Sequence, residues 1–150
     1  MFLTEAFNVD PVGELDFTTE LLYSNFSNYS AWHHRCRLLL ILKASKYELY
    51  RDTLEADLEL CKSAIFTQPS DQSVWFYANW LAKESALIKE SLVNACKELE
   101  ALEPDKHPLV VLFLAENTEN GANQYYDTLA RIDPMRAGLY SRMKNMQKDL

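Results

Sequence analysis

The chain has 150 residues, the length of one domain, and its 48% of hydrophobic residues supplies a core and excludes a fully disordered chain. It contains 3 glycines and 5 prolines, whereas average usage would give about 18 of the two together. This shortage disfavours β-sandwiches and barrels, which need many tight turns. The net charge of −7 disfavours nucleic acid as a partner.

Hydrophobic periodicity predicts eight helices in four pairs along the chain. The ranges are 14–25 with 30–45, 51–67 with 71–83, 86–102 with 106–116, and 122–132 with 134–148. Ser30, Asp71 and Asp133 are the expected N-caps, the last followed by Pro134 at the first helical position. The first 13 residues fit no helix and are expected to be an irregular or truncated start.

The predicted pairs differ in how much surface they bury. Ile88, Leu92, Cys96 and Leu99 form one apolar stripe, whereas the run from Leu109 to Ala115 is apolar on all sides. Because no pair buries its apolar side alone, neighbouring pairs must stack. The prediction is therefore an all-α fold, an α-solenoid of about four helix–turn–helix hairpins over residues 14–150.

A repeated sequence supports this interpretation. Residues 28–35, NYSAWHHR, recur at residues 71–78 as DQSVWFYA, with Trp32 and Trp75 at the same position. Aromatic residues at a fixed repeat position are typical of the core between helices. We therefore expect both tryptophans to be buried rather than to form a binding platform.

Several polar clusters invite a chemical role that the sequence does not support. A zinc site needs three or four convergent ligands, and His33, His34 and Cys36 find no second cluster because His107 lies far along the chain. We predict no metal site and no catalytic residue. The acidic run follows a helical stripe with its charges outward, so a solvated face is expected; its members are Glu98, Glu100, Glu103 and Asp105.

The cysteines and termini are similarly unremarkable. Cys61 and Cys96 lie on apolar stripes, where a thiol is inert. Three cysteines at wide spacing indicate reduced thiols of a cytoplasmic protein rather than a disulfide framework. No apolar run is long enough for a membrane span, and the first ten residues lack the basic region of a secretory signal.

The pattern Asn-x-Ser-x-Trp-x-x-Arg resembles the α-subunit repeat of the protein prenyltransferases. The stretches NFSNYSAWHHR, DQSVWFYANWL, KELEALEP and IDPMRAGLY occur in an order similar to that in the C-terminal half of Rab geranylgeranyltransferase α subunits. The similarity runs from about Glu14 to Met143. The repeat-signature residues, with an expected structural or interface role, are Asn28, Ser30, Trp32, Arg35, Asp71, Ser73 and Trp75.

The resemblance implies an αβ heterodimer in which a crescent of α-subunit hairpins wraps around a β-subunit barrel. Zinc and geranylgeranyl diphosphate are then expected on the β subunit, with no cofactor on this chain. The reaction implied is transfer of geranylgeranyl to C-terminal cysteines of Rab GTPases, which a Rab escort protein presents while docked on the α subunit. The family lysine that meets the diphosphate lies in an earlier repeat, so no residue here inherits that role.

Two functions remain open from the sequence. The first is a non-catalytic α subunit, or part of one, that braces the β subunit, helps to receive the escort protein with its Rab, and is inactive alone. The second is a free-standing helical-repeat adaptor for protein–protein interactions. Co-purification with a prenyltransferase β subunit would discriminate between them.

Overall fold

The computed structural model describes residues 10–148, which form eight α-helices, two short 3-10 helices and no strand. The expected all-α fold is confirmed. The described residues divide into two compact units, one made of residues 10–65 with 71–81 and the other of residues 66–70 with 82–148. Each unit is built from helices that follow one another in the sequence.

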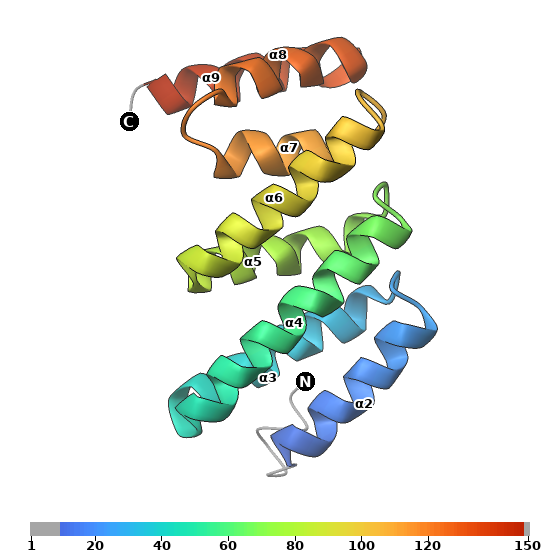
Figure 1. Ribbon diagram of the computed structural model, residues 1–150, viewed down its shortest axis with the longest axis vertical. Coiled ribbons are helices and arrows are strands. Elements are labelled where there is room, and N and C mark those ends of the chain that lie inside the picture. The colour runs from blue at the N-terminus through green and yellow to red at the C-terminus, as the bar shows by residue number, and fades with distance from the viewer. Residues whose placement is uncertain (1–9, 149–150) are drawn as a thin grey trace. The chain divides into compact units, whose positions relative to one another are not determined.

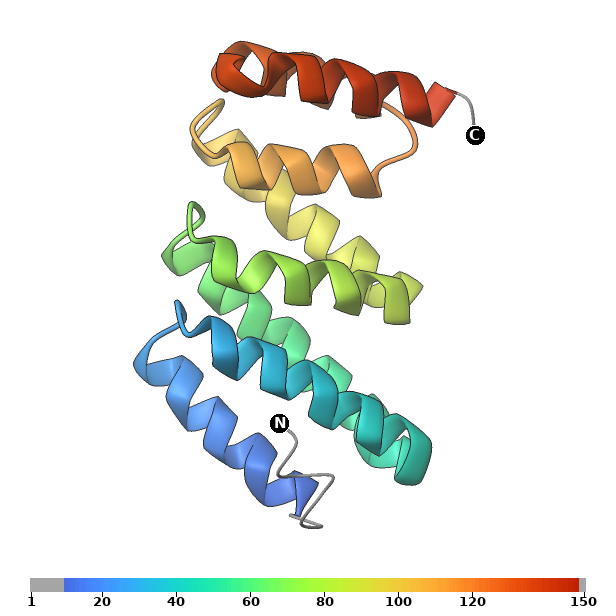
Figure 2. The same ribbon diagram turned by 180° about the vertical axis from the view of Figure 1, so that it is seen from behind.

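The first unit contains α2, α3, most of α4, η1 and most of α5 (Figure 1). The bounds are α2 Pro11–Ser24, α3 Tyr29–Ser45, α4 Tyr47–Thr67, η1 Gln72–Val74 and α5 Trp75–Glu84. Within this unit α2 and α4 lie on the face nearer the viewer in Figure 1, and α3 and α5 lie nearer in Figure 2. The unit therefore has two opposite faces made by alternate helices.

The second unit holds the remaining helices, and its neighbours α6 and α7, α7 and α8, and α8 and α9 are packed against each other. Their bounds are α6 Ala86–Leu102, α7 Pro108–Asn117, α8 Ala122–Ile132, η2 Pro134–Arg136 and α9 Ala137–Lys148. One buried cluster joins α7, α8 and α9 through Val111, Tyr126, Leu129 and Tyr140. The all-round apolar sequence of α7 is explained by this burial on more than one side.

Two helices begin earlier than their patterns predicted. Helix α2 begins at Pro11, because Asp10 caps it by accepting a hydrogen bond from the Val12 backbone N–H. Helix α4 begins at Tyr47, directly after the end of α3, so a single residue, Lys46, separates the two. Residues 1–9 of the expected irregular start lie outside the described residues.

The caps correct two of three sequence expectations. Asn28, and not Ser30, caps α3 by accepting a hydrogen bond of 3.1 Å from the Ala31 N–H. Asp71 caps η1 as predicted, through the Ser73 N–H. Asp133 makes no side-chain cap, because its carboxylate instead accepts hydrogen bonds from Arg136 and Tyr140.

The core of the first unit is built around Trp32, which is 0% exposed. Its indole N–H donates to the Phe26 carbonyl at 2.8 Å, and its ring lies 5.2 Å from that of Tyr77 on α5. Trp75, the equivalent residue of the second copy, is also buried. Both tryptophans therefore belong to the core. Across residues 10–148, no helix combines the length and apolar character that crossing a bilayer requires.

Replacing Trp32 with alanine should lower the free energy of unfolding by about 3–5 kcal/mol, because the cavity left by a large buried aromatic does not refill. Urea denaturation followed by circular dichroism measures this loss. Tyr29→Ala is the matched control, since Tyr29 lies on the same helix but is 55% exposed, and it should cost less than about 1 kcal/mol. Equal losses for the two variants would contradict the core assignment of Trp32.

Candidate protein-docking site

A buried ion pair joins two helices at the centre of the first unit. Arg35 on α3 donates two hydrogen bonds to Asp57 on α4, from Nε to Oδ2 at 2.8 Å and from Nη2 to Oδ1 at 2.6 Å. The Asp57 side chain is 0% exposed. Two parallel bonds between a guanidinium and a carboxylate fix the relative orientation of the two side chains as well as their distance.

Further contacts extend this pair to α2 and α5. Arg35 Nη1 donates to the Leu15 carbonyl at 3.0 Å and to the hydroxyls of Thr18 and Thr19. From the other side, the hydroxyl of Tyr77 donates to Asp57 Oδ2. One charged pair therefore satisfies polar groups of four helices, which is the condition for keeping charges in a low-dielectric interior.

The protonation states in this network follow from burial and from the Asp57 charge. Burial lowers the pKa of Arg35, but the hydrogen bond and the charge of Asp57 outweigh it and raise that pKa above its ordinary value. Burial, assisted by the Asp57 charge, raises the pKa of the Tyr77 phenol and of the Cys61 thiol well above their usual ranges. Arg35 therefore stays protonated at neutral pH, while the Tyr77 phenol and the Cys61 thiol stay neutral.

The remaining signature residues hold a turn rather than the core. The carboxylate of Asp71 accepts hydrogen bonds from the Ser27 hydroxyl and from the Ser73 N–H. The Ser73 hydroxyl donates to the Ser27 carbonyl at 3.0 Å. These contacts fasten the start of α3, capped by Asn28, to η1, whereas Ser30 is exposed in the first turn of α3.

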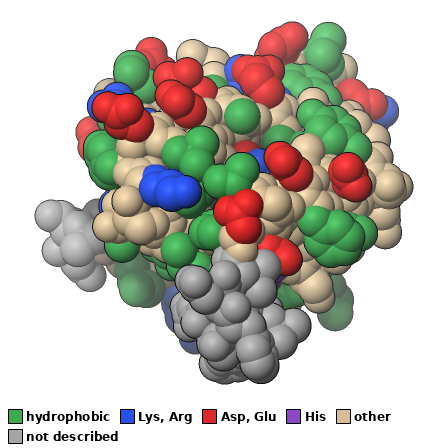
Figure 3. All heavy atoms as spheres, turned by 90° about the horizontal axis from the view of Figure 1, so that it is seen from below, with side chains coloured by type: hydrophobic (Ala, Val, Ile, Leu, Met, Phe, Trp, Pro, Cys, Tyr) green, Lys and Arg blue, Asp and Glu red, His purple; other side chains and the backbone are tan. Residues whose placement is uncertain are grey.

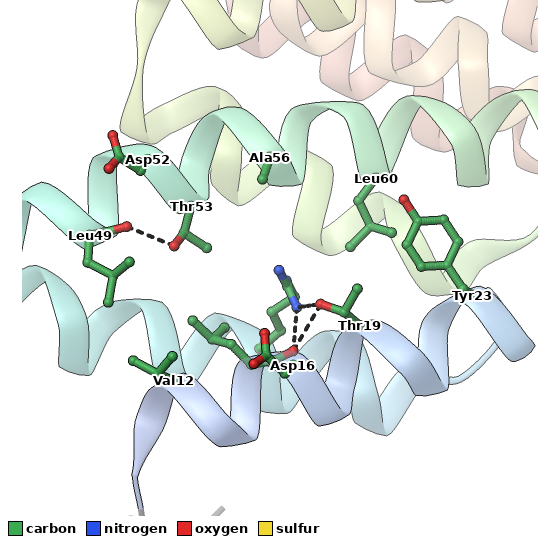
Figure 4. A pocket seen from close by; sticks show the side chains of 11 residues that line it. Val12, Asp16, Thr19, Tyr23, Leu49, Asp52, Thr53, Ala56 and Leu60 are labelled. Carbon is green, nitrogen blue, oxygen red and sulfur yellow. Dashed lines mark hydrogen bonds between the residues drawn. The ribbon is translucent and has the colours of Figure 1, made fainter.

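A groove opens above Arg35 on the face of the first unit formed by α2 and α4. It encloses about 340 Å³, within the range of sites that receive a ligand or a partner's side chain. Figure 4 shows the side chains of α2 and α4 facing each other across it. The lining residues are Val12, Leu15, Asp16, Thr19, Tyr23, Arg35, Leu49, Asp52, Thr53, Ala56 and Leu60.

The chemistry of the groove is apolar inside and acidic at its edges. Leu15 and Leu60 are buried in its walls, while Asp16 and Asp52 are exposed. The charge of Arg35 is already balanced by Asp57, so the net charge of the lining that faces solvent is negative. On the end of the molecule that Figure 3 shows from below, acidic side chains are interspersed with hydrophobic side chains and with some basic ones. Such a groove suits an apolar side chain accompanied by a cationic one.

The other sequence candidates are not gathered into a site. His34 Nε2 lies 3.1 Å from Glu14 Oε2, and His107 Nε2 lies 2.5 Å from Glu103 Oε2, on different units. Within residues 10–148, no group of three or more His, Cys, Asp or Glu side chains is arranged to hold a metal ion.

The acidic run is less uniformly solvated than its pattern suggested. Glu103 pairs with His107, and Asp105 pairs with Arg131 at 2.7 Å. These two members lie in the loop between α6 and α7, where one pair lies within the loop and the other joins the loop to α8.

Sequence reasoning missed Asp57 and Tyr77. The signal for Asp57 was present: it falls on the same helical stripe as Tyr50, Leu54 and Cys61, all of them buried. A carboxylate on an apolar stripe requires a buried partner. Tyr77 carried no such signal, because an aromatic residue on an apolar helix already has a sufficient explanation in packing.

Comparison with known protein families shows that the residues bonded around Arg35 and Asp57 lie in two matched sequence repeats. Residues 12–42 and 54–85 match the family described as protein prenyltransferase alpha subunit repeat. The first stretch covers α2 and α3, and the second covers most of α4 together with η1 and α5. Arg35 therefore lies in one matched repeat, and both of its partners on α4 and α5 lie in the next.

Relatives extend the similarity along the chain. The geranylgeranyl transferase type-2 subunit alpha of Homo sapiens is 45% identical over 148 residues, which cover 82% of this chain and 26% of the human protein. The subunit of Pongo abelii is 35% identical over 148 residues, with 26% of its length covered. The subunit of Schizosaccharomyces pombe is 29% identical over an alignment 184 residues long, gaps included. This alignment covers 91% of this chain and 51% of the yeast protein.

The fold and the matched repeats define a helical-repeat protein of the prenyltransferase α-subunit class. More particularly, the chain is a homologue of the α subunit of geranylgeranyl transferase type-2, which is a subunit of a transferase enzyme. It spans about a quarter of the length of these mammalian relatives and about half that of the fission yeast relative.

Replacing Asp57 with asparagine should lower the free energy of unfolding by about 3–5 kcal/mol, because it leaves the Arg35 charge buried without a counter-charge. The control is the triple variant Arg35→Met, Asp57→Leu, Tyr77→Phe, which removes the pair together with its third member. Buried ion pairs replaced by apolar residues are often neutral, so the triple variant should recover most of the loss. A triple variant as unstable as Asp57→Asn would contradict this explanation.

The free energy of unfolding should also fall as the pH rises above about 9. Burial raises the pKa of the Cys96 thiol to about 12, and the pKa values of Cys61 and Tyr77 are raised as well. These groups keep their protons in the fold but lose them in the unfolded chain, so rising pH favours unfolding. Between its pKa in the unfolded chain and its higher pKa in the fold, each group lowers the free energy of unfolding by about 1.4 kcal/mol per pH unit.

Urea titrations at several pH values test this dependence. In the Cys96→Ala variant the free energy of unfolding should fall less steeply with pH, because the contribution of Cys96 is absent while those of Cys61 and Tyr77 remain. A free energy of unfolding that is constant between about pH 8 and about pH 10.5 would contradict the proposed protonation states.

Proposed function

We propose that the chain acts as a non-catalytic α-subunit component of a Rab geranylgeranyltransferase. In this role it braces the catalytic β subunit and helps to receive the escort protein with its Rab, so that geranylgeranyl is transferred to C-terminal Rab cysteines in the cytoplasm. The observation that carries the proposal is the 45% identity with the human type-2 α subunit over 82% of this chain, joined to the matched repeats.

The state of the nucleophilic side chains supports a scaffold rather than a catalyst. Burial raises the pKa of the thiols of Cys61 and Cys96, which keeps them protonated and shielded. The polar groups with the strongest interactions, Arg35 and Asp57, are saturated by each other and by neighbouring helices. In the proposal, the β subunit therefore supplies zinc and binds geranylgeranyl diphosphate.

The groove between α2 and α4 is the proposed contact for the escort protein. Its buried leucines and exposed Asp16 and Asp52 match a partner surface that carries an apolar side chain next to a lysine or arginine. A contact of this kind fixes register through the apolar side chain and speeds association through the charges.

Co-expression with a type-2 β subunit tests the first part of the proposal. The tagged chain should retain the β subunit through affinity purification and gel filtration. Incubated alone with geranylgeranyl diphosphate, zinc, magnesium, a Rab and its escort protein, it should transfer no lipid. Zinc-dependent transfer by the chain alone would contradict a non-catalytic role, and failure to retain the β subunit would favour the adaptor function.

The groove is tested with the double variant Asp16→Lys, Asp52→Lys. Reversing both charges should weaken capture of the escort protein at least tenfold, while retention of the β subunit stays unchanged. The control replaces two exposed carboxylates outside the groove, Glu90→Lys and Glu98→Lys on α6. An equal loss of escort protein in the control would show a general charge effect and contradict the groove as the contact.

A further inference from the structure

The loop between α7 and α8 contains the one Asn-Gly pair of the sequence, Asn120 followed by Gly121. Asn120 is exposed, and its side-chain amide forms no hydrogen bond within the described part of the chain. Asn117, the last residue of α7, differs in this respect, because its amide donates to the Phe113 carbonyl at 2.9 Å. The side chain of Asn120 can therefore turn toward its own backbone, whereas that of Asn117 is held.

Gly121 leaves the backbone nitrogen after Asn120 accessible. Its φ of +89° lies in the left-handed region, which glycine adopts without strain because it has no Cβ. Among the described residues other than its chain neighbours, none places an atom within 4 Å of the position that a Cβ would occupy. The Gly121 carbonyl accepts hydrogen bonds from the N–H groups of Gln124 and Tyr125, whereas its own N–H donates none within residues 10–148. The nitrogen is therefore neither shielded nor engaged.

A hollow at this loop gives solvent access to Asn120. It encloses about 430 Å³ between α6 and the loop, and Asn120 is one of the residues that line it. Lys89 and Lys97 of α6 line the same hollow together with Glu90 and Glu119, so the charges of its lining are balanced. Water can therefore reach the Asn120 amide, and a new carboxylate at this position would make the lining acidic.

We propose that Asn120 is a site of spontaneous deamidation, which converts it to aspartate and isoaspartate and alters the start of α8. The Gly121 nitrogen loses its proton to solvent and attacks the Asn120 side-chain carbon, Cγ. A C–N bond forms, and the amide nitrogen of the side chain takes up a proton and leaves as ammonia. Water then opens the resulting cyclic imide, its hydroxyl adding to one of the two carbonyl carbons while its other hydrogen returns to the Gly121 nitrogen. The inference is independent of the proposed function.

The two products differ in what they do to the second unit. Isoaspartate lengthens the main chain by a methylene group directly before α8, whose first turn is bonded to the Gly121 carbonyl. Ala122, the next residue, is buried in the cluster that joins α7, α8 and α9. Because a close-packed core transmits small displacements, the longer main chain shifts either this turn or its buried contacts. Aspartate keeps the ordinary main chain and adds only a negative charge to the hollow.

Incubation of the full chain in neutral buffer, followed by trypsin digestion and tandem mass spectrometry, tests the site. Cleavage after Lys106 and after Arg131 places Asn117, Asn120 and Asn123 in one peptide. The other two asparagines are therefore controls under identical conditions. The mass increase that marks exchange of an amide for an acid should be found at Asn120. Deamidation at Asn117 or Asn123 with Asn120 intact would contradict the proposal.

Two variants and a reference peptide sharpen the test. Asn120→Gln should abolish the modified peptide, because ring closure from the longer side chain is slower. The matched control Asn94→Gln changes an exposed asparagine within α6 and should leave modification at Asn120 unchanged. A synthetic peptide of residues 117–123 carries the same Asn-Gly pair without the fold and sets the incubation time. An unmodified chain after the peptide has converted would show that the fold protects Asn120, and would overturn the proposal.

The effect on α8 is measured on the separated products. A protein L-isoaspartyl methyltransferase with a labelled methyl donor detects isoaspartate, which mass alone does not distinguish from aspartate. The isoaspartyl chain, purified by anion exchange, should melt at a lower temperature than the unaltered chain. Asn120→Asp should melt with the unaltered chain, because its main chain is of ordinary length. Equal melting temperatures for all three chains would contradict the effect on α8, and an equal loss in Asn120→Asp would assign that loss to charge and contradict it too.

Discussion

The first unit depends on one interaction, the paired hydrogen bonds between the Arg35 guanidinium and the Asp57 carboxylate. Each partner alone would be an uncompensated charge in the interior, at a cost of several kcal/mol. Together they bring α3 and α4 into register and leave hydrogen-bonding capacity for α2, through Leu15, and for α5, through Tyr77. Hydrophobic burial supplies most of the stability of such a domain, but it is indifferent to small rotations of one helix against another. The ion pair is not, because its bonds are directional.

The repeat explains how one sequence pattern produces both a core and a surface. At the Trp position, Trp32 and Trp75 are buried in both copies, and at the following position His33 and Phe76 come together at the margin. The copies differ two residues after the tryptophan, where His34 pairs with Glu14 and Tyr77 reaches Asp57. They differ again at the Arg position, since Ala78 stands where the first copy has Arg35. The network around Asp57 therefore contains one arginine, Arg35 from the first copy, and the neutral hydroxyl of Tyr77 from the second copy.

Helix ends that depend on hydrophobic periodicity could be predicted from the sequence. Helix caps and contacts that depend on the choice among several polar partners could not. The stripes of α6 and α8 set their ends at Leu102 and Ile132, as the structure has them, because apolar residues at helical spacing have few alternatives. Ser30 was expected to cap α3, but Ser27, Asn28 and Ser30 all have side chains that can cap a helix, and only the backbone geometry decides between them. Asp133 was expected to be an N-cap, but its carboxylate accepts hydrogen bonds from Arg136 and Tyr140 instead. The groove joins residues of three helices, so no single segment of the sequence carries its pattern.

The buried network supports both faces of the first unit. Arg35 lines the groove and donates a hydrogen bond to Thr19, another lining residue, while Asp57 accepts a hydrogen bond from Tyr77 on α5, a helix of the opposite face. A disturbance of the ion pair is therefore transmitted to both faces, whereas substitutions at Asp16 or Tyr29 affect only one. In the proposed α-subunit role, this connection would keep contacts on the two faces in a fixed relative position. Among the signature residues, Arg35 joins its own repeat to the next one through Asp57, so the repeat signature contributes directly to how the helices of the first unit are held together.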